Sequence, residues 1–203
     1  MGLKEAKVNF IIDVAKELFL TRSISLVTIK DIANEAEVGE MTIYRYFGKK
    51  QNIVLAVVLK LQNEIANNYF KLENGVTGFE KISIFYNSYL DIFLSTPSYY
   101  QFIREFDSYM LENSDSSSLK GYEDELNKYK EVYISSYELG LKDKSIKKHE
   151  NIEMFYYAST HSLLELCKKL SVNEGLLSQD QTIEKKLELK TLIDIFLNSL
   201  KNS

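Results

Sequence analysis

Hydroxyl, phenol and basic side chains are concentrated between residues 28 and 50. The residues that we expect to face outward there are Glu40, Met41, Thr42, Tyr44, Arg45 and Tyr46, and the candidates for DNA contact also include Thr28, Lys30, Lys49 and Lys50. Apolar residues at helical spacing predict a buried side, made of Ile32, Ala33, Val38, Ile43 and Phe47. The major groove of DNA, about 12 Å wide, admits one α-helix, so a short helix held by its apolar side can present its other side chains to base edges. The segment therefore predicts a DNA-reading unit.

Several of these side chains also have a purely structural interpretation. Tyr44 and Tyr46 could pack in the core of a small domain. Lys49 and Lys50 could be no more than the solvated start of a helix. The sequence leaves these alternatives open for each residue taken singly, but the complete set favours DNA contact.

No residue pattern points to catalysis. The sequence has no nucleophile with an associated base and acid, and no glycine-rich phosphate-binding loop, so we do not expect an enzyme. Cys167 is the only cysteine, and His149 and His161 are the only histidines, so we expect neither a metal site nor a cofactor. The two histidines are interpreted as surface or packed residues and Cys167 as a small core residue.

The charge is unevenly distributed along an acidic chain. The net charge of the 203 residues is −4, yet residues 1–50 hold eight Lys and Arg against seven Asp and Glu. The N-terminal quarter is therefore the part suited to contact DNA. No apolar run approaches the roughly 18 residues of a membrane span, and the N-terminus does not resemble a signal peptide, so a soluble cytoplasmic protein is expected.

The scarcity of glycine (8) and proline (1) favours an all-α fold. Apolar periodicity predicts about nine helices. Their expected ranges are 4–20, 29–36, a third helix over 40–47 that ends at Gly48, 50–71, 79–94, a sixth that opens at Pro97, 122–139, 151–170 and 182–200. Thr28, with Asp31, is the expected N-terminal cap of the second helix. The polar stretch 113–118 is the expected mobile loop.

The expected domains are a helix-turn-helix DNA-binding domain over residues 1–49 and a larger helical bundle over 50–203. The long helix that begins at Lys50 should join them mechanically.

The segment from Ile11 to Ile53 reads IIDVAKELFLTRSISLVTIKDIANEAEVGEMTIYRYFGKKQNI. Its diagnostic pieces are the Ala15–Phe19 helix end, Thr28 with Asp31-Ile32-Ala33, Ala36-x-Val38, Thr42-Ile43-Tyr44-x-Tyr46-Phe47, and Lys50-x-x-Ile53. In order and spacing the segment resembles the TetR family (TetR/AcrR type) of transcriptional regulators. The resemblance implies an N-terminal helix-turn-helix domain, a helical C-terminal domain and binding to double-stranded operator DNA.

The resemblance also implies residue roles. These are base or nearby phosphate contacts for Thr42 and Tyr46, backbone phosphate contacts for Tyr44 and Lys50, and a flanking contact for Lys30. Thr28 would combine helix capping with a phosphate contact through its hydroxyl and the neighbouring amides.

Three positions depart from the family pattern. Glu37 stands where the turn usually has glycine, so a left-handed backbone there would cost roughly 1 kcal/mol. Gly39 stands where a hydroxyl cap is common. Glu40 brings a carboxylate near phosphates, which would weaken non-specific binding unless the carboxylate accepts from a cytosine amino group.

The last two expected helices carry more apolar surface than a solvated helix needs. Their stripes are Ile152, Phe155, Tyr156, Ser159, Leu163, Leu166, Cys167 and Leu170, and then Ile183, Leu187, Ile193, Phe196, Leu197 and Leu200. The resemblance implies that these helices form a homodimer interface, and the alternative is burial within one chain. A dimer would suit a palindromic operator, because two reading helices must meet successive major grooves.

Fourteen tyrosines and eleven phenylalanines predict an aromatic interior in the central helices. Candidate residues for a ligand cavity are Tyr86, Tyr89, Phe93, Phe102, Phe106 and Tyr109, with plain core packing as the alternative. An apolar or amphipathic small molecule bound there would release a repressor from its operator. The alternative is a dimeric DNA-binding regulator without a small-molecule effector.

Overall fold

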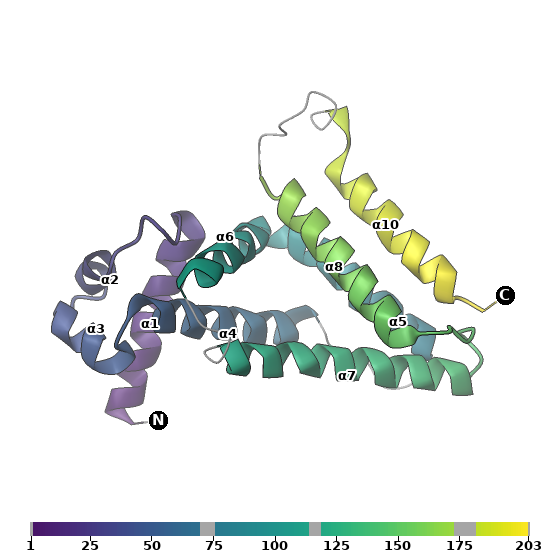
Figure 1. Cartoon of the computed structure of the whole chain (residues 1–203), viewed down its shortest axis with the longest axis horizontal. Coiled ribbons are helices and arrows are strands. Elements are labelled where there is room, and N and C mark those ends of the chain that lie inside the picture. Colours follow the sequence, from purple (N-terminus) through teal and green to yellow (C-terminus); the bar gives the residue numbers. More distant parts are fainter. Residues whose placement is uncertain (1, 70–75, 114–118, 173–181, 203) are drawn as a thin grey trace. The chain divides into compact units, whose positions relative to one another are not determined.

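The computed structural model describes residues 2–69, 76–113, 119–172 and 182–202, which are helical with short connections (Figure 1). The helices of these residues are α1 (Leu3–Thr21), α2 (Ile29–Glu35), α3 (Glu40–Phe47), α4 (Lys50–Tyr69), α5 (Gly78–Ser95), α6 (Pro97–Asn113), α7 (Lys120–Lys142), α8 (Ile152–Leu170) and α10 (Lys185–Leu200). The all-α prediction is confirmed, and each predicted helix is present with bounds within three residues of those expected. The predicted mobile stretch lies, apart from Asn113, outside the described residues.

The chain forms two compact units, and each unit consists of two separate stretches of the sequence. The N-terminal unit contains residues 1–63 and 101–123, and the C-terminal unit contains 64–100 and 124–203. Helices α4, α6 and α7 therefore each contribute to both units. The functional division into 1–49 and 50–203 stays a prediction. Among the described helices, none combines the length and the apolarity required to span a membrane.

The core of the N-terminal unit is built around one face of α1. Ile11, Ala15 and Phe19 are buried at the predicted helical spacing. The ring of Phe19 stacks on Phe102 of α6 with 6.4 Å between centroids, and Phe102 stacks on Phe106 at 6.2 Å. Each buried side chain of this size contributes roughly 1.5 to 3 kcal/mol relative to exposure. The second half of α6 is thus part of the same core as α1.

A hydrogen-bonded cap starts α2, as the sequence predicted. The amide of Asp31 donates to Oγ1 of Thr28 at 3.1 Å, and the Thr28 amide donates to the Asp31 carboxylate at 2.8 Å. These bonds from Thr28 hold the pKa of Asp31 below its usual value. They satisfy amides that the first turn of a helix otherwise leaves unpaired.

The turn between α2 and α3 is a Schellman motif with a glutamate in the glycine position. The amide of Val38 donates to the carbonyl of Ala33 at 2.9 Å. The amide of Glu37 donates to the carbonyl of Asn34 at 3.2 Å. Glu37 has a φ of 50°, so the predicted left-handed backbone is confirmed. Figure 1 shows the result: α2 and α3 are joined by a tight turn next to α1.

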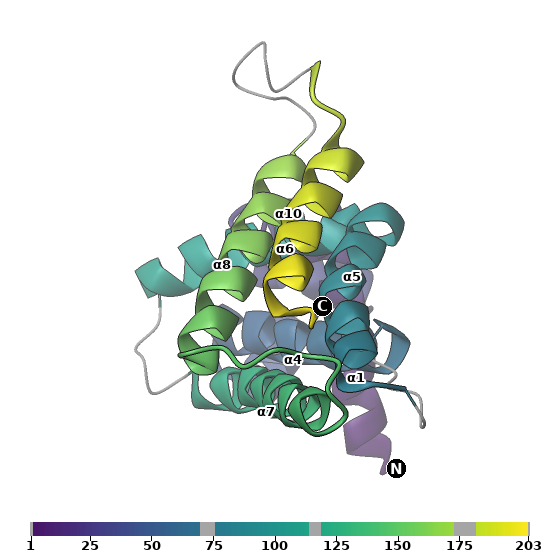
Figure 2. The same cartoon turned by 90° about the vertical axis from the view of Figure 1, so that its right-hand side faces the viewer.

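Three helices pack together in the C-terminal unit. Figure 2 shows α10 running between α8 and α5, and residues of α10 contact both neighbours. Aromatic rings fill the interior, with Phe85 against Tyr133 at 5.2 Å and Tyr86 against Phe196 at 5.7 Å. Offset and edge-on ring pairs of this kind contribute about 0.5 to 1.5 kcal/mol beyond their buried area.

Two glycines allow α5 and α7 to touch. A Cβ atom added to Gly78 would lie 2.1 Å from the backbone nitrogen of Gly140, which no side chain can tolerate. Asp143, just after α7, accepts from the Gly78 amide at 2.8 Å and so caps the start of α5. The sequence predicted a helix over 79–94, and Gly78 is the first residue of this helix, at a close backbone contact.

Replacing Glu37 by glycine tests the cost of its left-handed backbone. We expect Glu37→Gly to raise the free energy of unfolding by roughly 0.5 to 1 kcal/mol, because glycine adopts positive φ without a Cβ clash. Glu37→Ala is the matched control, since it also removes the carboxylate but keeps a Cβ atom and should give no such gain. Denaturant titration of the three proteins measures the difference. A clear loss of stability in Glu37→Gly would contradict this account of the turn.

Candidate DNA-binding site and its supporting surfaces

Helix α3 separates its side chains into a buried and an exposed set. Ile43 and Phe47 are buried, whereas Met41 is 79% and Tyr44 46% exposed. Glu40 and Arg45 are exposed as well. The side chain of Tyr44 therefore faces solvent, and core packing does not account for it. An eight-residue helix with one side fully available has the form required to enter a groove.

Thr42 and Tyr46 are half-buried at the edge of this exposed set. The guanidinium carbon of Arg45 lies 5.1 Å from the centroid of the Tyr46 ring, a cation–π distance. The contact orients the Arg45 cation along the helix surface. Both predictions for Tyr46, packing and DNA contact, remain compatible with its half-buried position.

The departures from the family pattern lie at the start of α3. Gly39 precedes the helix and supplies no side-chain cap, although its carbonyl accepts from the Thr42 amide at 2.8 Å. Glu40 occupies the first turn, where its negative charge is favourable to the helix dipole. Since Glu40 is also exposed, its carboxylate can accept a hydrogen bond from a base amino group and would repel a nearby phosphate.

The Thr28 hydroxyl is already engaged. Its Oγ1 donates to the Asp31 carboxylate at 2.7 Å and accepts from the Asp31 amide. The capping role is therefore confirmed, while a phosphate contact would have to replace Asp31 as the acceptor. Lys30, in the first turn of α2, is exposed.

The two lysines at the start of α4 differ in exposure. Lys49 is exposed, but Lys50 is half-buried. The Lys50 ammonium donates to the backbone carbonyl of Ile24 and lies 5.2 Å from the centroid of the Tyr109 ring. Burial lowers the pKa of Lys50, and the opposing effect of the Asp31 charge is smaller. In this arrangement the Lys50 ammonium is engaged by groups of the N-terminal unit, and its phosphate contact stays a prediction.

The six predicted cavity residues are divided between the two compact units. Tyr86, Tyr89 and Phe93 belong to the C-terminal unit, and Phe102, Phe106 and Tyr109 belong to the N-terminal unit. Within each unit these rings contact other rings: Phe93 lies 6.5 Å from Tyr100, and Phe106 lies 5.1 Å from Tyr122. Core packing, the alternative left open by the sequence, accounts for these contacts.

A buried chain of hydroxyl groups crosses the C-terminal unit, and the sequence did not predict it as a site. Ser159 donates to the carbonyl of Tyr156 at 3.1 Å. Because each hydroxyl carries one proton, Tyr86 then donates to Ser159 at 2.7 Å and Tyr133 to Tyr86 at 2.9 Å. Burial raises the pKa of Tyr86 to about 12, so the chain stays protonated at neutral pH. Ser159 within an apolar stripe was the available signal.

The apolar stripes predicted for the last two helices mostly face inward. Tyr156, Leu163, Cys167 and Leu170 are buried within the unit itself, as are Ile193, Leu197 and Leu200. Intramolecular burial, the alternative interpretation, therefore accounts for these residues. His161 is exposed, and Cys167 is fully buried as predicted.

A second apolar set on α8 and α10 faces solvent. Met154 is 62% exposed, Leu187 58% and Ile195 57%. An open groove of about 450 Å³ lies beside Leu187 and Ile195 and is lined by Leu166, Ile183, Glu184, Leu187, Glu188, Thr191, Leu192 and Ile195.

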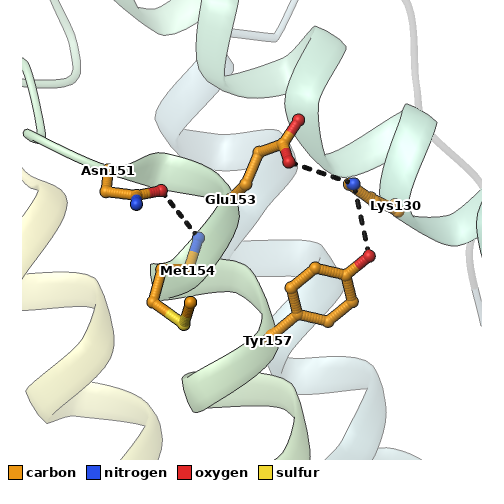
Figure 3. A network of polar contacts seen from close by, with 5 residues as sticks. All are labelled: Lys130, Asn151, Glu153, Met154 and Tyr157. Atoms are coloured by element: carbon orange, nitrogen blue, oxygen red, sulfur yellow. Dashed lines mark hydrogen bonds and ion pairs between the residues drawn. The ribbon is translucent and has the colours of Figure 1, made fainter.

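Lys130 of α7 holds the exposed edge of α8 in place. Figure 3 shows its ammonium between the Glu153 carboxylate and the Tyr157 hydroxyl, each at 3.3 Å. The hydrogen bond to Tyr157 and the charge of Glu153 raise the pKa of Lys130. Asn151 caps the same helix by accepting from the Met154 amide at 3.0 Å. Met154 and Tyr157 thus stand side by side on a fixed helix end.

Among the described residues, no group of three or more His, Cys, Asp and Glu side chains could hold a metal ion.

Sequence comparison assigns the N-terminal region. Residues 11–57 match the family described as bacterial regulatory proteins, tetR family. A 58-residue stretch, 29% of the chain, is 33% identical to the HTH-type transcriptional regulator AlkX of Mycobacterium tuberculosis. The match spans 28% of the length of AlkX.

Solved structures extend the likeness to the fold of the whole chain. A transcriptional regulator from Saccharomonospora viridis, solved in complex with choline, superposes with a TM-score of 0.73 at 16% identity, over 98% of this chain and 99% of that one. A regulatory protein in the tetR family from Rhodococcus RHA1 superposes with a TM-score of 0.67 at 13% identity, over the full length of both chains. Residues 11–57 thus match the tetR family of bacterial regulatory proteins, and the chain as a whole shares its fold with solved regulators described as members of that family.

Proposed function

We propose that this protein is a homodimeric regulator that binds a palindromic operator through α3 and represses transcription until a small molecule releases it. The observation that carries DNA binding is the exposed side of α3, which coincides with the region matched by the family. Thr42 and Tyr46 are the proposed base or near-phosphate contacts. Tyr44 and Lys49 are proposed to contact backbone phosphates, and Lys30 a flanking one.

The second copy of the chain is the proposed occupant of the groove on α8 and α10. Ile183, Leu187 and Ile195, which line the groove, expose apolar surface that a monomer gains nothing by leaving in water. Burying them against the same surface of a partner forms a two-fold interface, in which each patch meets its own copy. Two reading helices about 34 Å apart can then enter successive major grooves of a palindromic site.

The proposed ligand response centres on the C-terminal unit. The buried hydroxyl chain of Tyr133, Tyr86 and Ser159 offers polar groups within an aromatic interior, the combination that recognises amphipathic molecules. A ligand would have to displace rings that are in contact in this conformation. The fold relative solved with choline makes that cation a suitable first probe, since aromatic rings attract quaternary ammonium groups.

A regulator without an effector is the second candidate. It is favoured by the ring contacts made by the six predicted cavity residues and by their division between the two units. Both candidates share the DNA-binding and dimer surfaces. They differ only in whether a small molecule changes operator affinity.

Paired variants separate base contacts from phosphate contacts. Lys49→Ala should weaken binding to operator and to unrelated DNA equally and should reduce the salt slope of log K by about one. Thr42→Ala should instead cost roughly 1 to 3 kcal/mol on the operator alone. A duplex selected from a random pool serves as the operator, and fluorescence anisotropy at several salt concentrations gives the affinities. Equal losses on both duplexes in Thr42→Ala would remove it from the base contacts.

A charge placed in the groove tests the dimer. Ile195→Glu should convert the protein to a monomer and lower operator affinity at least tenfold, because two carboxylates would be buried in the interface. Leu141→Glu, on an exposed position of α7 in the same unit, is the control and should remain dimeric. Analytical ultracentrifugation reports the mass. A dimeric Ile195→Glu protein would contradict the proposed location of the interface.

Reciprocity tests the ligand response. If choline or another amphipathic probe lowers operator affinity tenfold, operator must lower affinity for that probe tenfold, a coupling of about 1.4 kcal/mol. Calorimetric titration of the probe with and without operator duplex measures both, and Tyr86→Phe should weaken probe binding by removing one hydroxyl from the chain. Equal probe affinities in the two titrations would exclude release by that ligand and would favour the effector-free candidate.

A further inference from the structure

Both backbone polar groups of one buried residue are held by side chains from distant helices. Ile24 lies in the connection between α1 and α2, and its side chain is fully buried. Its amide donates to Oε2 of Glu105 on α6 at 2.7 Å. Its carbonyl accepts from the ammonium of Lys50 at the start of α4. The Glu105 carboxylate and the Lys50 ammonium thus hold the connection at Ile24.

The two side chains are committed to this contact. Glu105 is half-buried, and its sequence separation from Ile24 is 81 residues. Lys50 is half-buried over the ring of Tyr109, which places an aromatic face beside its charge. A charged partner strengthens a hydrogen bond to a backbone group in a partly dry environment. The connection between α1 and α2 is therefore more restrained than a solvated loop would be.

This connection sets the position of the reading unit. Four residues after Ile24 comes Thr28, which caps α2, and α2 leads through the Schellman turn into α3. A shift at Ile24 therefore moves the first turn of α2. The geometry points to Glu105 and Lys50 as positioning residues for DNA binding, which act through Ile24 without touching DNA; this inference rests on the proposed DNA-binding function.

The inference and a simple charge argument predict opposite signs at Glu105. Removal of a carboxylate from a DNA-binding unit should raise affinity by electrostatics alone. If Glu105 positions the connection, Glu105→Ala should instead lower operator affinity about tenfold, the effect of losing one charged hydrogen bond to a buried group. Glu105→Gln keeps an acceptor oxygen and should retain most of the affinity. Glu112→Ala, an exposed carboxylate on the same helix, is the control and should not lower it.

The salt slope separates the two roles of Lys50. Lys50→Met keeps the aliphatic stem and removes the donor. A positioning role predicts a loss of operator affinity with an unchanged salt slope, whereas a phosphate contact predicts equal losses on all DNA and a slope smaller by about one. A smaller slope in Lys50→Met would overturn the assignment of Lys50.

Amide hydrogen exchange tests the contact without DNA. In Glu105→Ala we expect the Ile24 amide to exchange at least about tenfold faster, because its acceptor is gone. The Arg22 amide, which donates to the carbonyl of Leu18 at 2.9 Å, is the internal reference and should keep its rate. An unchanged Ile24 rate would overturn the contact itself.

Faster exchange with unchanged operator affinity in Glu105→Ala would overturn the positioning role. A wild-type chain that selects no duplex would instead refute the proposed function, and the exchange rates would still report whether the contact exists.

Discussion

An eight-residue helix does not hold its shape alone in water, and this constraint governs the N-terminal unit. Helix α3 keeps its shape because Ile43 and Phe47 are buried, and its residues contact α2, which in turn contacts α1. The caps on either side have the same purpose. They satisfy the backbone at both ends of the α2–turn–α3 segment, so that the exposed side chains of α3 project from a fixed frame rather than from a fraying turn.

Local features of this frame could be predicted from the sequence. The Thr28 and Asp31 cap depends on residues three apart, and the left-handed Glu37 depends on where a helix must end. Helical periodicity also identified which side of α1 and α3 is buried. These features involve few residues at short separation, where side-chain type and spacing nearly determine the geometry.

Features that depend on tertiary partners could not be predicted. The start of α4 resembles any solvated helix start, so nothing local indicated that Lys50 turns inward toward Ile24. The aromatic residues of α5 and α6 carry the pattern of buried faces, but the pattern does not say which partner each face meets. Periodicity therefore found Phe93 and Phe102 as core residues and could not assign them to different units. Likewise, it placed Leu187 and Leu197 in one stripe of the last helix and could not show that Leu187 is exposed while Leu197 is buried.

The N-terminal unit is discontinuous in sequence, and this has a consequence for synthesis. Phe19 packs on Phe102, and the amide of Ile24 is paired by Glu105, so neither contact can form while the chain ends near residue 63. At the usual rate of about 5 to 20 residues per second, the ribosome needs several more seconds to deliver α6. During that time the apolar face of α1 lacks part of its cover. A nascent chain of this length is a natural substrate for chaperones, and the reading unit matures only after the middle of the protein has emerged.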